Sequence, residues 1–295
     1  MVEEFSAAER LLEEVGLLNS KPPVPIELVL EYLATKGLKL CYYTPHDAPG
    51  PIKEAASDVD EVLVYQGKTA FLFVNQSRAI TRQRFSIFHG VGHFLLPNHR
   101  GLNYLTQGCT AMDPLTLKPF ERQADRFAAA MNMPPRPFRN HMALLPFGMP
   151  TVENLAQIYF ASIESAAIRY VDLIDTPLAL ICLEREYEQH GLIIPDSPLK
   201  VRYQASNVSF PFRIKPGTVI PLENELFWAC SKDEYYTEGS LNGSDLGLKP
   251  GIKLWINCLP QNHVGGVLAL VYPGNDPPKC VIDPLKVIQG VPNGR

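Results

Sequence analysis

The sequence lacks the features that mark exported, membrane-spanning and nucleic-acid-binding proteins. Its first stretch, MVEEFSAAERLLEEVG, has neither the basic start nor the apolar core of a signal peptide. No apolar run approaches the roughly 20 residues that a membrane helix needs. Lys and Arg number 27 against 31 Asp and Glu, so the net charge of −4 provides no positive field for DNA or an anionic membrane. We therefore expect a cytoplasmic protein that binds no membrane.

Paired cysteines are also missing from the sequence. None of the six cysteines belongs to a C-x-x-C pair, which removes the usual signal of a zinc ribbon or a redox motif. In a chain without an export signal, scattered cysteines are more often reduced core thiols than disulfides. The six positions are Cys41, Cys109, Cys182, Cys230, Cys258 and Cys280.

The 295 residues suffice for two domains, and the pattern of apolar residues along the chain changes near Thr176. Before that point, apolar residues at helical spacing alternate with a few strand-like runs. After it, short apolar runs separated by Gly, Pro and Asn predict a β-rich region. We therefore predict an α+β fold in three parts, with boundaries at residues 1–148, 149–175 and 176–295.

The predicted elements of the first part follow from periodicity and from proline and glycine signals. Helices are expected over residues 4–15, 26–36, 83–96 and 119–133, a strand at LKLCYY, a hairpin around QGK in EVLVYQGKTAFLFVN, and a loop over 99–119. Two short helices with a turn near Ser162 are expected next. Strand-like runs of the last part are LALICLE, LKVRYQA, ELFWACS, KLWINCL and GGVLALVYP.

The stretch FHGVGHF, residues 88–94, holds two histidines four positions apart. On a helix, His89 and His93 share one face and can point at one ion. Neutral imidazoles suit zinc, and a catalytic zinc site adds a carboxylate ligand and keeps one position open. The spacing alone is weak evidence, because such pairs more often only pack or make hydrogen bonds.

The surroundings of the pair strengthen the metal interpretation. The predicted helix is apolar around His89 and His93, and buried imidazoles need polar partners. Glu121 stands in the first turn of the next strong helix, far enough along the chain for a loop and a return. Glu121 could therefore supply a third ligand, although an acidic residue at this place also simply favours the helix dipole.

Two motifs resemble the ImmA/IrrE family of metallopeptidases. RQRFSIFHGVGHFLLP is similar to the family's active-site helix, R-[FW]-[ST]-x-x-H-E-x-G-H, and ERQADRFAAAMNMP is similar to its second motif, E-x-x-A-[ND]-x-F-A-A-x-x-[LM]-M-P. The resemblance covers about residues 5 to 135, and both motifs agree in order and spacing. It implies a zincin-like metallopeptidase domain with His89, His93 and Glu121 as ligands of Zn²⁺, or alternatively Mn²⁺. Gly92 matches the family glycine, where backbone or substrate is expected to come close.

Gly90 departs from the family pattern. The family carries Glu at this position as the general base of hydrolysis, and glycine has no group for that role. Loss of a positioned base costs about 10²–10⁴ in rate. Gly90 also costs a helix about 1 kcal/mol relative to Ala, and the sequence shows no structural gain in return. Gly90 is either a natural loss of activity or an introduced substitution, and the sequence does not distinguish these.

Two residues after the motif helix are weaker candidates. His99 and Tyr104 could face the metal and stabilise an oxyanion, although residues of such a loop are more often simply exposed.

The stretch NLAQIYFASIESAAIRYVDL has the outline of a helix-turn-helix. A DNA-recognition helix presents Lys or Arg to phosphates and bases. The second helix here has one basic residue, Arg169, and two acidic ones, Glu164 and Asp172. Direct DNA binding is therefore not expected. The longer ImmA/IrrE proteins have similar helices here, followed by sensor-like C-terminal domains. Some of those domains are GAF-like, and the β-rich part resembles them more weakly.

The resemblance implies a transcription regulator that cleaves a helix-turn-helix repressor in a stress response. With Gly90 in place of the general base, we expect severely impaired cleavage. The alternative is a non-catalytic metal-binding protein that binds the repressor without cutting it.

Overall fold

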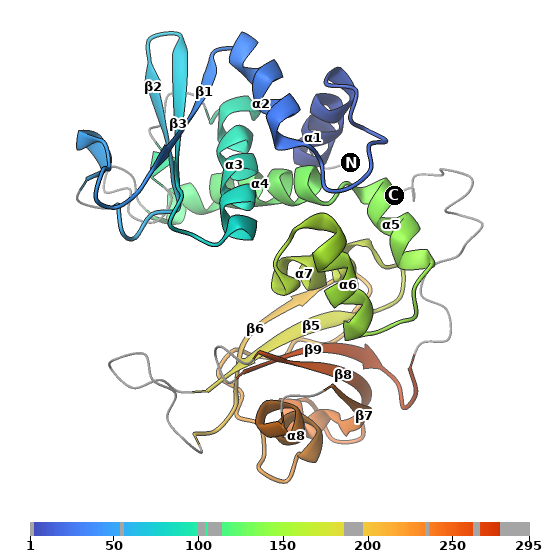
Figure 1. Cartoon of the computed structure of the whole chain (residues 1–295). Coiled ribbons are helices and arrows are strands. Elements are labelled where there is room, and N and C mark those ends of the chain that lie inside the picture. The colour runs from blue at the N-terminus through green and yellow to red at the C-terminus, as the bar shows by residue number, and fades with distance from the viewer. Residues whose placement is uncertain are drawn as a thin grey trace. The chain divides into compact units, whose positions relative to one another are not determined.

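The computed structural model shows two compact units and describes residues 3–53, 56–99, 104–105, 114–185, 197–233, 236–261 and 266–277. Unit 1 comprises residues 1–137 and 156–162, and unit 2 comprises residues 138–155 and 163–295. Helices and two separate sheets give the α+β class that the sequence predicts (Figure 1). The three-part division at residues 148 and 175 stays a prediction.

Unit 1 is built on a four-stranded sheet in the order β1-β3-β2-β4. Its strands are β1 (Leu38–Tyr43), β2 (Glu61–Gln66), β3 (Thr69–Asn75) and β4 (Tyr104–Leu105). β1 runs parallel to β3, whereas β2 pairs antiparallel with both β3 and β4. The β2–β3 hairpin expected around QGK is present, and Gly67 supplies the positive φ of its turn at +62°.

Four helices complete most of unit 1: α1 (Glu3–Glu14), α2 (Ile26–Thr35), α3 (Ile80–Leu95) and α4 (Pro114–Asn132). α3 packs against β2 and β3 and also against α4. Buried Leu63, Leu72 and Val74 of the sheet meet Phe88 and Val91 of α3 in one apolar core. This core fixes the position of α3 and of the histidines on it.

The prediction of a loop over residues 99–119 is wrong at two places. Tyr104 and Leu105 pair with β2 as β4, and α4 already begins at Pro114. A proline fits the first position of a helix, because the N–H that it lacks has no intrahelical partner there. Pro119, where the helix was predicted to begin, lies inside α4.

Unit 2 holds a five-stranded antiparallel sheet in the order β6-β5-β9-β8-β7. Its strands are β5 (Ala179–Glu184), β6 (Lys200–Ser206), β7 (Thr237–Asn242), β8 (Lys253–Gln261) and β9 (Gly266–Pro273). α7 (Ile163–Leu173) and α8 (Glu225–Asp233) cover opposite faces of this sheet (Figure 1). The likeness to GAF domains stays a prediction.

The remaining helices are α5 (Pro135–Ala143) and α6 (Met149–Tyr159), with short 3-10 turns at Gly50–Ile52 and Gly243–Leu246. α6 and α7 are the two short helices that the sequence predicts. The sequence analysis predicts no helix over α5, because the proline pair Pro134–Pro135 after α4 is a helix-end signal; Pro135 in fact opens the next helix.

The run ELFWACS was expected to be a strand and is α8 instead. Asn224 precedes it as an N-cap, because the Phe227 N–H donates to Asn224 Oδ1 at 3.3 Å. Phe227 and Cys230 are fully buried and pack on the sheet. A capped turn and a helical apolar face thus override the strand-like composition.

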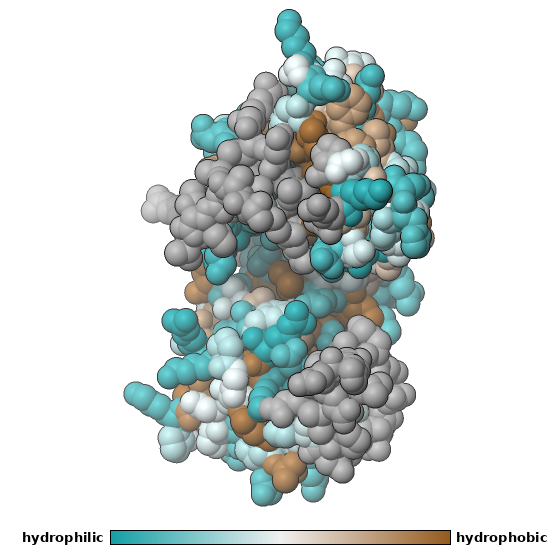
Figure 2. Space-filling view, turned by 90° about the vertical axis from the view of Figure 1, so that its left-hand side faces the viewer, coloured by the Kyte–Doolittle hydropathy of each residue, from teal (hydrophilic) through white to brown (hydrophobic). Residues whose placement is uncertain are grey.

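The cysteines that the structure describes, Cys41, Cys182, Cys230 and Cys258, are free thiols, whereas Cys109 and Cys280 lie outside the described residues. No helix in the described ranges is long and apolar enough to cross a membrane. On the face shown in Figure 2, hydrophobic residues are interspersed with hydrophilic ones.

Candidate metal centre

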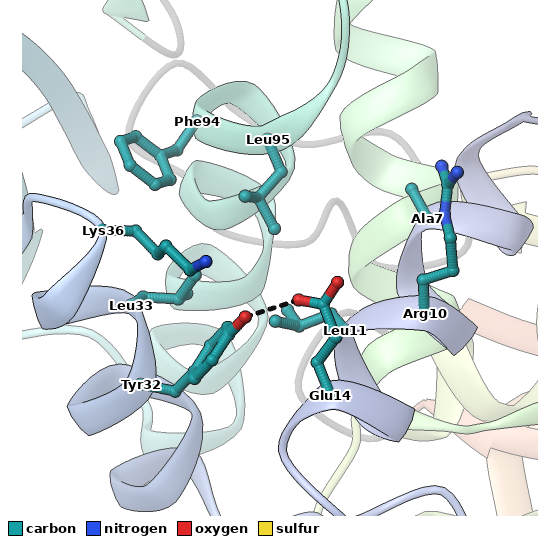
Figure 3. Close-up of a pocket in the computed structure, with 9 residues that line it drawn as sticks. All are labelled: Ala7, Arg10, Leu11, Glu14, Tyr32, Leu33, Lys36, Phe94 and Leu95. Atoms are coloured by element: carbon teal, nitrogen blue, oxygen red, sulfur yellow. Dashed lines mark hydrogen bonds between the residues drawn. The ribbon is translucent and has the colours of Figure 1, made fainter.

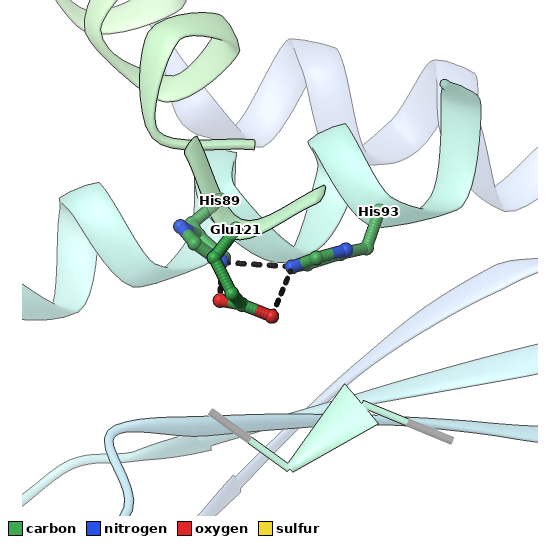
Figure 4. A group of neighbouring side chains, drawn as sticks. All are labelled: His89, His93 and Glu121. Atoms are coloured by element: carbon green, nitrogen blue, oxygen red, sulfur yellow. Dashed lines mark hydrogen bonds and ion pairs between the residues drawn. The ribbon is translucent and has the colours of Figure 1, made fainter. Parts of the chain in front are cut away.

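Three potential metal ligands converge where α3 meets α4 (Figure 4). His89 Nε2 lies 2.9 Å from His93 Nε2. The carboxylate of Glu121 reaches both rings, with Oε2 at 3.2 Å from His89 Nε2 and Oε1 at 3.5 Å from His93 Nε2. One ligand atom from each residue lies within 4.8 Å of the others. The i, i+4 spacing on α3 and the first described turns of α4 therefore bring together the three residues that the sequence singles out.

Asp125 orients the ring of His89. Its Oδ1 lies 3.0 Å from His89 Nδ1, so the Nδ1–H donates to the carboxylate and Nε2 keeps a free lone pair. Metal-binding histidines typically have such a partner, which fixes the tautomer and raises ligand basicity. Asp125 thus prepares His89 for a ligand role.

His99 orients the ring of His93 and fixes its tautomer in the same way. His99 Nε2 lies 2.9 Å from Gln123 Oε1, an acceptor, so that nitrogen carries the proton. His99 Nδ1 is then an acceptor for the His93 Nδ1–H at 3.0 Å. This chain leaves His93 Nε2 with its lone pair toward Glu121. His99 is buried behind His93, outside the three-donor group, and its predicted oxyanion role stays untested.

Tyr104, the other oxyanion candidate, has its backbone in β4 beside Leu63 of β2. Its side chain lies outside the described part of the structure.

The hydrogen-bond pattern fits a cation at the centre. With both Nδ1 atoms donating, His89 Nε2, His93 Nε2 and the Glu121 carboxylate are all acceptors that face one another at 2.9 to 3.5 Å. Such groups repel unless a proton or a metal ion lies between them. Two imidazoles and a carboxylate are a donor set that zinc accepts.

In the absence of metal, a proton takes this place. Burial alone lowers the pKa of His89, but the carboxylates of Glu61, Asp125 and Glu121 outweigh it and raise the pKa to about 10. For His93, burial dominates and lowers the pKa to about 4. Burial raises the pKa of Glu121, but the close contacts with the two histidine rings, above all the hydrogen bond from protonated His89, prevail and bring it to about 2. The site is thus built to hold positive charge at His89.

Gly90 has a structural role that the sequence did not reveal. A Cβ at this position would lie 2.3 Å from Cδ1 of Leu72, a fully buried residue of β3. Glycine lets α3 approach the sheet, and the Leu72 side chain fills the space beside it. The expectation that Gly90 brings no structural gain is therefore wrong.

Gly92 allows a close approach on the α4 side. A Cβ there would lie 3.2 Å from the Ala124 Cα and from the Phe127 ring. This is the close backbone contact that the family motif suggested, and it presses α4 against α3 so that Glu121 reaches the histidines.

A shallow pocket also opens in unit 1 between α1, α2 and the end of α3 (Figure 3). Tyr32 Oη donates to Glu14 Oε2 at 2.6 Å across it, with Arg10 and Lys36 nearby. None of its lining residues belongs to the three-donor cluster, so the pocket adds nothing to the metal site.

Sequence reasoning missed Asp125, Gln123, Glu61 and Leu72 as parts of the site. Asp125 carried a signal, because it follows Glu121 by one helical turn on the same face of α4 and matches the [ND] of the second motif. Leu72 and Glu61 lie on strands that reach α3 only through tertiary packing. No local pattern could have found them.

Comparison with known proteins shows that one stretch of the chain is similar to a known family. Residues 46–170 match the family model described as the IrrE N-terminal-like domain, Peptidase_M78, which confirms the ImmA/IrrE resemblance for that region. The chain is also similar to a solved structure described as a Mycobacterium tuberculosis transcriptional regulator, with 13% sequence identity and a TM-score of 0.56 over 92% of this chain and 76% of that one. At that identity the likeness shows a shared fold. No curated protein matches the sequence.

Proposed function

From the IrrE N-terminal-like domain at residues 46–170, we propose that this protein is a metal-dependent regulator of the ImmA/IrrE type. Its first unit binds one divalent ion, Zn²⁺ or alternatively Mn²⁺, through His89, His93 and Glu121. Its partner is a helix-turn-helix repressor in a stress response. The observation that carries the proposal is the convergence of three acceptors within 4.8 Å in a domain of a peptidase family.

The chemistry of the site is incomplete for hydrolysis. A bound metal would supply Lewis acidity toward a peptide carbonyl and water. His89, His93 and Glu121 would hold it, while Asp125 and His99 keep both rings in the ligating tautomer. Gly90 offers no base, so peptide cleavage is expected to run about 10²–10⁴ slower than with a positioned carboxylate.

A second candidate function is repressor binding without cleavage. It is favoured by the packing of Leu72 against Gly90, because the space beside the general-base position is filled by a buried apolar side chain. The site would then hold metal as a structural or regulatory element.

Direct DNA binding is not part of the proposal. The one basic residue of α7, Arg169, is 1% exposed and therefore cannot reach phosphates from this position.

The test incubates the metal-loaded protein with a small helix-turn-helix repressor from the same organism, chosen from a neighbouring gene where there is one, and reads cleavage by mass spectrometry and binding by a pull-down. Because a Glu at position 90 needs space, the base is restored in the double variant Leu72→Ala/Gly90→Glu, with Leu72→Ala as its matched control. If the double variant cleaves the repressor and neither wild type nor Leu72→Ala does, the result supports a peptidase-type site and identifies Gly90 as the cause of the lost activity.

Metal-dependent binding without cleavage by any form supports the second candidate. Metal uptake that is unchanged in His89→Ala and His93→Ala variants contradicts the proposed function itself.

A further inference from the structure

We propose that Glu61 of β2 is a fourth protein ligand, which closes the metal site with two imidazoles and two carboxylates. The inference rests on the proposed metal binding by His89, His93 and Glu121, and it goes beyond the family motifs, which lie on α3 and α4.

The sheet register points Glu61 at the metal centre. Glu61 pairs with Val74, and Leu63 pairs with Leu72, so these four residues share the face of the sheet that packs on α3. The other three are fully buried apolar residues of the core. Glu61 is 4% exposed and thus places a carboxylate in apolar surroundings, where a charge needs a close counter-charge.

The contact of Glu61 with His89 is on the metal side of the ring. Glu61 Oε1 lies 3.7 Å from His89 Nε2, the nitrogen that faces His93 and Glu121. The other ring nitrogen, Nδ1, already bonds Asp125 at 3.0 Å. Asp125 therefore acts as the outer partner of the histidine, whereas Glu61 approaches the place where the ion would lie.

The separations among the three ligands are close to those of a tetrahedral shell. Metal–ligand bonds of 2.0–2.2 Å at tetrahedral angles place neighbouring donor atoms about 3.3–3.6 Å apart. The donor separations here are 2.9 Å between the histidines and 3.2 and 3.5 Å from Glu121 to each of them. Glu61 lies 3.7 Å from His89 but outside the group whose ligand atoms all lie within 4.8 Å of one another, so its carboxylate would turn toward the centre when an ion binds.

A fourth protein ligand changes what the site does. Catalytic zinc sites keep one position open, whereas sites with four protein ligands are structural. Glu61 would occupy the open position while Gly90 removes the base. Together, these two features would give a site that holds an ion without turning over a substrate.

The test replaces zinc by Co²⁺ in the full chain and records its visible spectrum with and without azide, which binds an open coordination position. Glu61→Gln removes the ligand with little change of shape. Asp60→Asn is the matched control, because Asp60 precedes Glu61 on the chain but pairs with Arg78 at 2.8 Å, away from the histidines. Thermal unfolding in chelator shows that all variants are folded.

We expect wild type and Asp60→Asn to bind one equivalent of Co²⁺ with a spectrum that azide leaves unchanged. Glu61→Gln should bind more weakly, by more than the roughly 10–100-fold that losing an outer partner costs, and its spectrum should respond to azide. If wild type responds to azide and Glu61→Gln keeps full affinity, the fourth-ligand inference fails while the proposed metal site stands. If no form binds Co²⁺ in a His89-dependent way, the proposed function fails as well.

Discussion

At the scale of single residues, Gly90 shows how one position can serve packing at the expense of chemistry. Its missing Cβ admits the Leu72 side chain, which would otherwise lie 2.3 Å from it. We expect Gly90→Ala to lower the free energy of unfolding by about 1–3 kcal/mol through overpacking, although alanine favours a helix by about 1 kcal/mol. Urea unfolding measures this. Gly50→Ala is the control, because nothing lies within 4 Å of its added Cβ.

The same pair of residues provides a sharper form of this prediction. If Leu72 is the obstacle, Gly90→Ala should cost less in a Leu72→Ala background than in wild type. Additive effects of the two substitutions would contradict the packing explanation.

His89 gives the metal site a defined pH dependence. With a pKa raised to about 10, His89 is protonated at neutral pH, whereas His93 with a pKa of about 4 is not. A metal ion must displace that one proton, so raising the pH favours binding by about tenfold per pH unit between roughly pH 5 and 9. Calorimetry with Zn²⁺ in two buffers of different ionisation enthalpy should show about one proton released. Equal heats in both buffers would rule this out.

The residues of the site differ in how far the sequence reveals them. His89 and His93 follow from their spacing on a helix, and Glu121 from the start of the next helix. Glu61 and Leu72 are specified by strand register and by packing across the sheet, which relate positions distant in the chain. Such contacts leave no periodic pattern, so only the folded structure reveals them.

At the scale of elements, the long periodic segments were predicted well, and four of the five short apolar runs of the last part are the strands β5, β6, β8 and β9, whereas ELFWACS is a helix. The helix expected over 83–96 and the hairpin around QGK are present as α3 and β2–β3. ELFWACS failed because a run of this length fits a strand or one face of a helix equally well. The local signal that decides it is the Asn224 cap before α8.

This explanation predicts the effect of removing the cap. Asn224→Ala should destabilise unit 2 by at least about 1 kcal/mol, because the Phe227 N–H loses its acceptor and Asp245 Oδ2 loses the Asn224 Nδ2 donor at 3.0 Å. Asn224→Ser should recover the contribution of the cap, since a serine hydroxyl can accept the same bond, but not the bond to Asp245. Asn242→Ala, the same change at an exposed position, should alter stability by less than about 0.5 kcal/mol. Thermal unfolding followed by circular dichroism compares the three.

At the scale of the whole molecule, the change of composition near Thr176 predicts a β-rich region, and the five-stranded sheet of unit 2 begins at Ala179. Residues 156–162 belong to unit 1, although the segments on both sides belong to unit 2. A composition change along the chain cannot reveal such an exchange, because it depends on which core each helix turn packs into. The metal ligands, by contrast, all lie in unit 1.

The division into units allows metal binding to be followed in one unit while the other serves as an internal reference. Both tryptophans of the chain, Trp228 and Trp255, lie in unit 2. Zn²⁺ at about 100 times its Kd should stabilise unit 1 by about 2.7 kcal/mol. Chelation should therefore lower a transition seen by far-ultraviolet circular dichroism and leave the tryptophan fluorescence transition in place. A His93→Ala variant should show the lower transition with or without Zn²⁺. If the fluorescence transition moves together with the other, the two units unfold as one and metal binding stabilises the entire chain.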